Sequence, residues 1–368
     1  MNLITYQAYH FLEQIRLDKK HQVWIDFYKI FSDINIGLSD RSLQIRFPIK
    51  TLIPTEFQIP AAKEFHLSYQ DCCLIRATEI LDKQESMDKP IYLMYSGGID
   101  SSTILSSFIE LLGLVQASQR ITIVMSKESI DENPYFWYKF IRPYFEIKLS
   151  DLGYNEFDFG DWIYVTGELN DQLFGSDLLY DANYWAGNQY LNQMATVDNI
   201  SKYFLEAKKI DPNSAQTWAR LLIQNLKTCP KHNGQIWDTF WWYNFCWKWI
   251  YVYYRVFLFS KYEGQLDIAW VKNNYFPFFA DNNFQLWSLS GLEPKHLNSI
   301  ESYKVTAKKF VCKVLGSNEY MKKTKKQSLK NIVSFRPRRH SLTDQLEIIH
   351  NNTIDINSII DLDSNIYE

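Results

Sequence analysis

Hydrophobic and polar positions follow two alternating patterns in the first half of the chain. An amphipathic stretch from His66 to Leu81 precedes the apolar run Ile91–Tyr95. A second amphipathic stretch runs from Ser101 to Leu112, where Gly113 is placed to end a helix. Amphipathic stretches of this length predict helices, and short apolar runs predict buried strands. This part of the sequence therefore predicts a helix, a strand and a second helix in succession.

The same alternation continues to residue 165. It predicts further strands at Arg120–Met125, Phe145–Leu149 and Trp162–Val165, and a helix at Asn133–Pro143. Strands that alternate with helices form parallel sheets covered by helices, so we expect an α/β fold with a parallel sheet flanked by helices. From Tyr184 to Leu315 the pattern is mainly helical and predicts a helical C-terminal half.

The two ends of the chain differ from this middle part. Near the N-terminus we expect helices at Tyr6–Leu17 and Gln22–Phe31 and a strand at Leu43–Pro48, before a proline-containing connector. After Phe335 the sequence becomes polar and acidic. We therefore divide the chain into an N-terminal extension (1–60), one large domain (61–335) and a polar tail (336–368).

Composition narrows the classes of ligand and location. The chain has 368 residues, is 46% hydrophobic and carries a formal net charge of −3, so small molecules are better-supported ligands than nucleic acids. Its five cysteines lack disulfide-framework or zinc-site spacing, and its start lacks a secretion signal, which favours a reducing cytoplasm. The aromatic run 240–254 contains Lys248, so we expect a buried or cleft-lining helix and no membrane span. We also expect its tryptophans to have a packing role.

The segment Ser96–Ser102 carries the strongest chemical signal. It reads S-G-G-I-D-S-S and joins a predicted strand to a predicted helix. Two adjacent glycines let backbone N–H groups point inward, and the positive end of the helix adds to the same place, which makes a cradle for an anion. Neither the Walker pattern nor the dinucleotide-binding pattern is present, so ordinary phosphoryl transfer and Rossmann redox chemistry are disfavoured.

A second loop follows the strand that ends at Val165. It reads T-G-E-L-N-D-Q-L-F-G over residues 166–175 and carries Glu168 and Asp171. The carboxyl ends of parallel strands lie at one edge of a sheet, where ligands bind. Carboxylates with phosphate oxygens are the usual ligands of Mg²⁺, and Asp100 and Asp171 are the natural pair to bind it.

These two loops resemble those of a known enzyme family. The first is similar to the pyrophosphate-binding loop (PP-loop) of N-type ATP pyrophosphatases, and the chain resembles the C-terminal synthetase domain of asparagine synthetase and relatives such as β-lactam synthetase. The second loop is similar to the family's G-E-G-S-D-E motif, and Pro277–Asp281 to its P-F-x-D segment. Lys304–Lys308 resembles its K-x-x-x-R helix, with lysine in place of arginine, and Lys325–Ser328 its basic closing stretch. The similarity covers roughly residues 62–335.

The resemblance implies an adenine nucleotide α-hydrolase-like (PP-loop) fold and an ATP-dependent carbon–nitrogen ligase. A substrate carboxylate attacks the α-phosphate of ATP to give an acyl-adenylate and pyrophosphate, and ammonia or an amine then displaces AMP to form an amide. Lys304 would stabilise charge at the α-phosphate, and Glu168 would act as base for the amine or orient it. Asp100 and Asp171 would bind Mg²⁺. The remaining implied ATP contacts are Ser96, Gly97, Gly98, Ser101, Ser102 and Lys326 for pyrophosphate, with Met94, Val124, Met125 and Gly167 near adenine.

The sequence departs from the family pattern at positions that bear on the expected nitrogen source and on the identity of the carboxylic acid substrate. Position 2 is Asn2, where glutamine-dependent members carry a cysteine, and the 1–60 extension is too short for a glutaminase domain. Nitrogen is then expected from free ammonia, a separate glutaminase subunit or an amine-bearing substrate. Leu169 and Gln172 replace a glycine and an acid of the second motif, so aspartate is not assured as the substrate.

Other interpretations stay open at this stage. Arg336–Arg339 is the one feature in favour of a PP-loop enzyme that activates a nucleobase or tRNA carbonyl. A degenerate nucleotide-binding protein without catalysis is a third candidate, disfavoured because the acidic residues and Lys304 are retained together. Single residues also have structural interpretations: an exposed lysine face for Lys304 and Lys308, a solvated lysine cluster at 322–326, a helix cap for Asp281, and core packing for Cys72 and Cys73.

Overall fold

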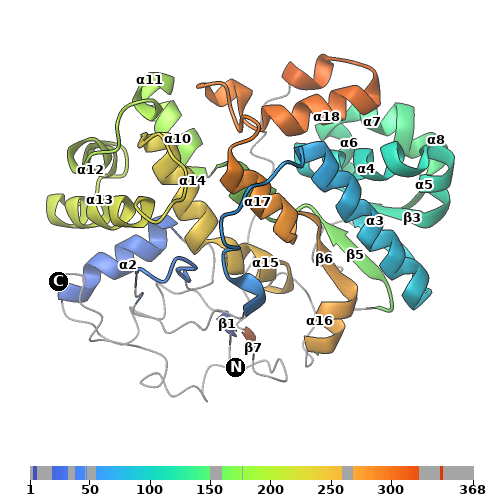
Figure 1. Cartoon of the computed structure of the whole chain (residues 1–368), viewed down its shortest axis with the longest axis horizontal. Helices are drawn as coiled ribbons and strands as arrows, with labels where there is room; N and C mark the ends of the chain where they lie inside the picture. The colour runs from blue at the N-terminus through green and yellow to red at the C-terminus, as the bar shows by residue number, and fades with distance from the viewer. Residues whose placement is uncertain are drawn as a thin grey trace.

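The structure, a computed structural model, describes residues 3–5, 19–31, 38–45, 47, 55–149, 160–175, 177–258, 268–322 and 340–342. Its centre is a five-stranded parallel sheet in the order β4-β3-β2-β5-β6. The neighbouring strands β5 and β6 are seen side by side in Figure 1. The strands are β2 (Ile91–Met94), β3 (Ile121–Met125), β4 (Glu146–Leu149), β5 (Ile163–Thr166) and β6 (Tyr275–Pro277).

Four of these strands confirm the predicted ones to within about a residue, and β6 was not predicted as a strand. β2 lies at the centre, with Ile91 paired with Ile121 of β3 on one side and with Ile163 of β5 on the other. The chain runs outward from β2 through β3 to β4, and then returns to the opposite side of β2 to form β5 and β6. The direction of strand addition therefore reverses between β2 and β5.

Alternating side chains of the strands pack on opposite faces of the sheet. Ile91 and Leu93 join the main core, where α3 (Tyr69–Met87), α4 (Ile99–Leu112) and α18 (Val305–Leu315) pack on one another. The intervening residues Tyr92 and Met94, with Tyr164 and Tyr275, pack against α15 (Trp249–Leu258) and α16 (Ile268–Asn274). Helices thus cover both faces, as expected for a parallel sheet.

The segment that joins β3 to β4 is helical, as predicted for residues 133–143. Three short helical pieces follow one another: α7 (Pro134–Phe136), the π-helix η2 (Trp137–Ile141) and α8 (Arg142–Tyr144). Helix α6 (Lys127–Glu132) precedes them in the same segment, and α5 (Leu114–Arg120) joins α4 to β3.

The second half is mainly helical, which confirms the prediction for residues 184–315. Its principal helices are α9 (Asn170–Phe174), α10 (Asp177–Ala186), α11 (Asn188–Leu191), α12 (Val197–Glu206), α13 (Pro212–Leu226), α14 (Ile236–Trp247) and α17 (Asn282–Ser290). The aromatic run forms α14 and α15, and Lys248 lies at their junction. Its tryptophans are buried, in agreement with the packing role. No helix in the described part of the chain has the length and apolar character needed to cross a membrane.

The described part of the N-terminal extension packs on this helical half. Helix α2 (Lys19–Phe31) confirms the predicted helix and lies beside α13 (Figure 1). Its Phe27 and Phe31 contact Trp218 and Trp247. A short β1 (Leu3–Thr5) pairs antiparallel with β7 (His340–Leu342), the described part of the polar tail. The predicted helix at residues 6–17 lies outside the described residues.

The predicted strand at Leu43–Pro48 is wrong over its described residues, which form a bend at Leu43 and irregular structure after it. The carboxylate of Asp40 accepts hydrogen bonds from the backbone N–H groups of Ser42, Gln44 and Ile45. A side chain that binds local backbone in this way competes with strand pairing. Leu43 consequently adopts φ +60° and is 73% exposed.

Candidate functional site

The two loops selected from the sequence meet where the strand order reverses. Residues 95–98 follow β2 and residues 167–169 follow β5, and these two strands are neighbours in the sheet. Ligands of open parallel sheets bind at such a reversal, beyond the carboxyl ends of the strands. The topology therefore brings the glycine loop and the acidic loop to the position that is typical of a ligand site.

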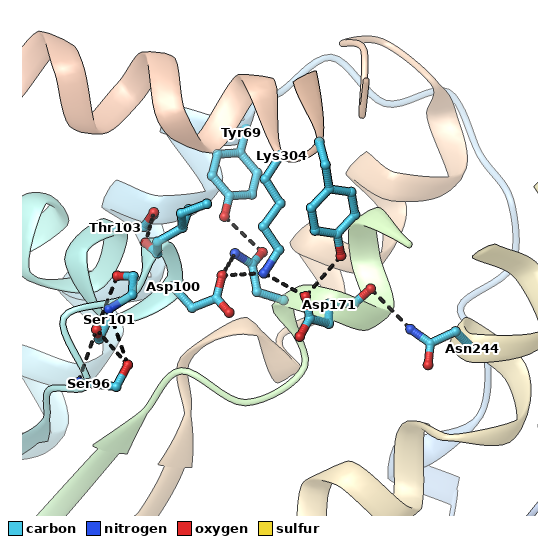
Figure 2. Close-up of polar contacts among 12 residues, drawn as sticks. Tyr69, Ser96, Asp100, Ser101, Thr103, Asp171, Asn244 and Lys304 are labelled. Atoms are coloured by element: carbon cyan, nitrogen blue, oxygen red, sulfur yellow. Dashed lines mark hydrogen bonds and ion pairs between the residues drawn. The ribbon is translucent and has the colours of Figure 1, made fainter. Parts of the chain in front are cut away.

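The glycine loop is shaped by its own serines. The N–H of Ser96 donates to Oγ of Ser101 at 3.2 Å, and that hydroxyl contacts the carbonyl oxygen of Gly98 at 3.3 Å (Figure 2). Gly98 caps α4, a helix of 14 residues whose first turn contains Asp100. The loop therefore leads directly into the positive end of a long helix, which favours anions.

Gly97 has a steric reason to be glycine. Its φ is +75°, and a Cβ there would clash with the backbone oxygen of Ser129 and the side chain of Glu132 in α6. A side chain at this position would require both a strained backbone and displacement of α6. The loop and the segment after β3 therefore fit together closely.

Gly167 brings the second loop against the first. A Cβ at Gly167 would lie 3.1 Å from Cβ of Asp100 and 3.5 Å from the backbone nitrogen of Ser101. The next loop residues are buried: Glu168 is 2% exposed, and Leu169 is 1% exposed with φ +76°. That left-handed conformation is uncommon for a residue with a side chain and favours glycine, so the backbone at Leu169 is strained.

Lys304 connects the two loops. Its Nζ lies 2.5 Å from Oδ1 of Asp100 and 2.9 Å from Oδ1 of Asp171 (Figure 2). The lysine side chain is 3% exposed, whereas those of Asp100 and Asp171 are 26% and 30% exposed. The site therefore buries an ammonium group beneath two carboxylates that solvent can still reach.

The backbone of Lys304 also departs from the ordinary helix. Lys304 is the N-cap of α18 and has φ +58°, a left-handed conformation that is uncommon for a residue with a side chain. Backbone strain of this kind costs about 1–3 kcal/mol and concentrates at functional sites. The conformation is consistent with a lysine whose position matters more than local stability.

Neutral side chains support the two carboxylates. The amide of Asn170 donates to Oδ1 of Asp100 at 2.6 Å, and the hydroxyl of Tyr69 donates to Oδ1 of Asn170 at 2.9 Å. On the other side, the hydroxyl of Tyr303 donates to Oδ1 of Asp171 at 2.9 Å. Burial raises the pKa of both phenols well above the ordinary range, so both remain protonated donors.

The chemistry of this donor set fits a magnesium–phosphate ligand. Two carboxylates and one ammonium leave the ionised cluster with a net charge of −1, and one cationic group already contacts both carboxylates. The described residues contain no group of three or more His, Cys, Asp or Glu side chains able to hold a metal. Mg²⁺ commonly takes one or two carboxylates and completes its shell with phosphate oxygens and water, so Asp100 and Asp171 suffice.

The remaining residues predicted to contact ATP do not all lie at the carboxylate pair. Ser102 is fully buried, and its hydroxyl lies 3.2 Å from that of Tyr95 and 3.4 Å from the amide nitrogen of Asn133, so its contact with phosphate stays a prediction. Met94 ends β2, and Val124 and Met125 end β3, on the loop side of the sheet. Lys326 lies outside the described residues.

Four residues for which the sequence also allowed a purely structural role are held in place by local hydrogen bonds or by burial. The interpretation of Lys304 and Lys308 as an exposed lysine face is wrong, because both residues are only 2% exposed. Nζ of Lys308 donates to the carbonyl oxygen of Glu301 at 3.0 Å, and Asp281 caps α17 through the N–H of Asn283. Cys72 and Cys73 are buried free thiols whose pKa values are raised by burial, in agreement with core packing. None of these four is placed as a catalytic group by its contacts.

Sequence reasoning missed several residues of the site. Asn170, Tyr69 and Tyr303 were not selected, and neither was Asn244, which donates to the carbonyl oxygens of Asp171 and Gly175 (Figure 2). Asn170 and Tyr303 are each adjacent in sequence to a selected residue, so adjacency was an available signal. No local pattern distinguishes Tyr69 or Asn244.

A comparison of the sequence with protein-family models finds no match, and a search of curated proteins finds none either.

Proposed function

We propose that this protein is an ATP-dependent ligase that forms AMP and pyrophosphate while it joins a carboxylic acid to ammonia or an amine. The observation that carries the proposal is the placement of Lys304 between Asp100 and Asp171, next to a glycine loop that opens a long helix. An anion cradle, a carboxylate pair and a buried cation are the groups that adenylation of a carboxylate needs.

In the first step, an oxygen of the substrate carboxylate attacks the α-phosphorus, and the bond from that phosphorus to the bridging oxygen of pyrophosphate breaks. The N–H groups of Gly97 and Gly98 and the hydroxyls of Ser96 and Ser101 would hold the departing pyrophosphate. Asp100 and Asp171 would bind Mg²⁺, which neutralises phosphate charge when bound. The main contribution of these groups is to position the reactants and to offset developing charge.

In the second step, the amine nitrogen attacks the acyl carbon, AMP leaves, and the amine loses a proton. Lys304 stabilises the negative charge that develops at the α-phosphate in both steps. Glu168 is the candidate base, buried in the same loop as Asp171. Met94, Val124 and Met125, at the ends of β2 and β3, are the candidate adenine contacts.

The direct test is exchange of radiolabelled pyrophosphate into ATP against a panel of carboxylic acids. We expect exchange that depends on both Mg²⁺ and one class of acid, with AMP as the nucleotide product when an amine is added. Lys304→Met should lower the exchange rate by about 100- to 1,000-fold, whereas Lys272→Met, at an exposed lysine in α16, is the matched control. ADP as the sole nucleotide product would contradict the proposal, and AMP formation that requires tRNA instead of an acid would favour the nucleobase-activating alternative.

A further inference from the structure

Asp100 uses one of its two carboxylate oxygens for contacts within the protein. Its Oδ1 accepts from the amide of Asn170 at 2.6 Å and lies 2.5 Å from Nζ of Lys304 (Figure 2). Its Oδ2 makes no hydrogen bond or ion pair with another residue of the described ranges, and the side chain is 26% exposed. Each carboxylate oxygen has lone pairs of its own, so Oδ2 keeps its acceptor sites for a metal ion.

The amide of Asn170 has its orientation fixed from both ends. Its Nδ2 faces the carboxylate of Asp100, which would repel the amide oxygen, and its Oδ1 accepts from the hydroxyl of Tyr69 at 2.9 Å. Asn170 and Tyr69 are both 0% exposed, so solvent does not compete for these two hydrogen bonds. Loss of either bond would leave a buried polar atom unpaired, which is costly, and the amide is therefore held in one orientation.

The tyrosine behind Asn170 is itself held in place. Tyr69 is the first residue of α3, whose start is capped by reciprocal hydrogen bonds between Ser68 and Asp71. Its ring lies 4.8 Å from that of Trp287 and 5.3 Å from that of Phe174, centroid to centroid. These contacts fix the position of the hydroxyl, so the start of α3 is linked through one amide to a carboxylate of the site.

We infer that Asn170, held by Tyr69, is a positioning residue that orients Asp100 so that Oδ2 faces the metal ion. The inference rests on the proposed function, because Asp100 is one of the two carboxylates that would bind Mg²⁺. Lys304 contacts the same oxygen of Asp100, but in the proposed mechanism its ammonium group also serves the α-phosphate. Asn170 has no such second task, and it keeps the carboxylate in place while Lys304 acts on phosphate.

Equilibrium dialysis of radiolabelled ATP, in Mn²⁺ as a substitute for Mg²⁺ or in a chelator, tests this role without turnover. Asn170→Leu removes both hydrogen bonds at nearly constant volume and should weaken ATP binding in Mn²⁺ by about 10- to 100-fold. Tyr69→Phe keeps the ring and removes the hydroxyl, and should weaken it by about 3- to 10-fold. Binding in the chelator should be unchanged in both variants, because the glycine loop is not altered.

Tyr190→Phe is the matched control. Tyr190 is also buried, and its hydroxyl donates to the carbonyl oxygen of Asn199 at 2.8 Å, between α11 and α12. Tyr69→Phe and Tyr190→Phe should lose similar stability to urea, whereas only Tyr69→Phe should weaken binding in Mn²⁺. In the exchange assay, Tyr69→Phe should need about 3- to 10-fold more Mg²⁺ for half-maximal rate and reach the wild-type rate at saturation.

The possible failures are distinct. Unchanged binding in Mn²⁺ by folded Tyr69→Phe, or equal weakening in Tyr190→Phe, would overturn the inference even if Asn170→Leu does not fold. Equal weakening in Mn²⁺ and in the chelator would also overturn it, because the effect would then not involve the metal. If the wild-type protein exchanges pyrophosphate with no acid while both variants weaken binding in Mn²⁺ alone, the ligase proposal is refuted and the positioning role stands.

Discussion

Two buried clusters in this molecule have opposite chemistry. In the helical half, the ring of Trp247 lies between 5.4 and 6.2 Å from the rings of Phe27, Phe31, Phe47 and Tyr243, centroid to centroid. At the sheet edge, the buried group is the ammonium of Lys304. The first cluster joins α2 to α14, and the second joins the loops after β2 and β5.

The difference shows which cluster is explained by stability alone. Aromatic side chains gain from burial and from edge-to-face contacts, so the Trp247 cluster needs no further explanation. A buried ion cluster loses hydration that its internal attractions only partly restore, and well-packed apolar residues are often at least as stable. The retention of Lys304 with Asp100 and Asp171 therefore favours a chemical role for the second cluster.

The largest effect on stability is expected at the aromatic cluster. Trp247→Ala removes a fully buried ring and should lower the free energy of unfolding by about 3–5 kcal/mol, as measured by urea denaturation. Tyr184→Ala, at a side chain that is 95% exposed, is the control and should change it by less than about 0.5 kcal/mol. The protein that remains folded should keep its exchange rate. A loss of rate without a loss of stability would mean that Trp247 belongs to the site.

The next largest effect is expected on catalysis. Lys304→Met should lower the exchange rate by about 100- to 1,000-fold, because the charge at the α-phosphate loses its buried cation. The free energy of unfolding should change by less than about 2 kcal/mol, since the two carboxylates remain partly exposed and can bind water or a cation. If Lys304→Met instead unfolds the protein and the folded fraction keeps its exchange rate, then the Lys304 cluster serves stability, as the Trp247 cluster does.

A smaller effect is expected on the pH dependence of stability, through a half-buried histidine in the helical half. Burial against Trp237 lowers the pKa of His296 from 6.5 to about 4, so the folded protein holds this ring neutral. The unfolded chain binds a proton more readily, and stability is therefore full above pH 6.5 and is lost as pH falls from 6.5 toward 4. We expect a loss of about 1–2 kcal/mol over this window, because solvent reaches part of the ring.

Unfolding of two histidine variants at pH 7.5 and pH 4.5 measures this contribution. His296→Phe keeps an aromatic ring on Trp237 and should be less sensitive to acid than the wild-type protein. His66→Gln is the control, because His66 is an exposed side chain with an exposed ion-pair partner. Equal acid sensitivity of wild-type and His296→Phe proteins would place the titrating groups elsewhere.

The sequence predicted the sheet well because its signals there are local. Strands β2, β3 and β5 are mainly apolar runs, β4 alternates charged and apolar residues, and Gly113 ends α4 where expected. β6 was missed because its three residues end at Pro277, and a strand so short has no periodicity to detect. The strand expected at Leu43–Pro48 failed because Asp40 binds the local backbone, an interaction that hydrophobic patterning does not contain.

The charged residues of the candidate site could be predicted from the sequence, whereas most of the neutral side chains that hydrogen-bond to them could not. Asp100, Asp171 and Lys304 were selected from motifs, and the structure brings all three together. Tyr69 reaches the site from α3, about a hundred residues before Asn170, so only the folded topology reveals it. Lys248 was noted as a charge in an aromatic run, but its position beside the carboxylates depends on how α14 packs against α9.

The most direct test of the account is calorimetric titration of ATP with and without Mg²⁺. If Asp100 and Asp171 hold a metal for a triphosphate on the glycine loop, Mg²⁺ should tighten ATP binding by about tenfold or more in the wild-type protein, equivalent to at least about 1.4 kcal/mol. Asp171→Asn should remove most of that gain. Binding of ATP with the same affinity in the absence of Mg²⁺, or a gain from Mg²⁺ that persists in Asp171→Asn, would contradict the account.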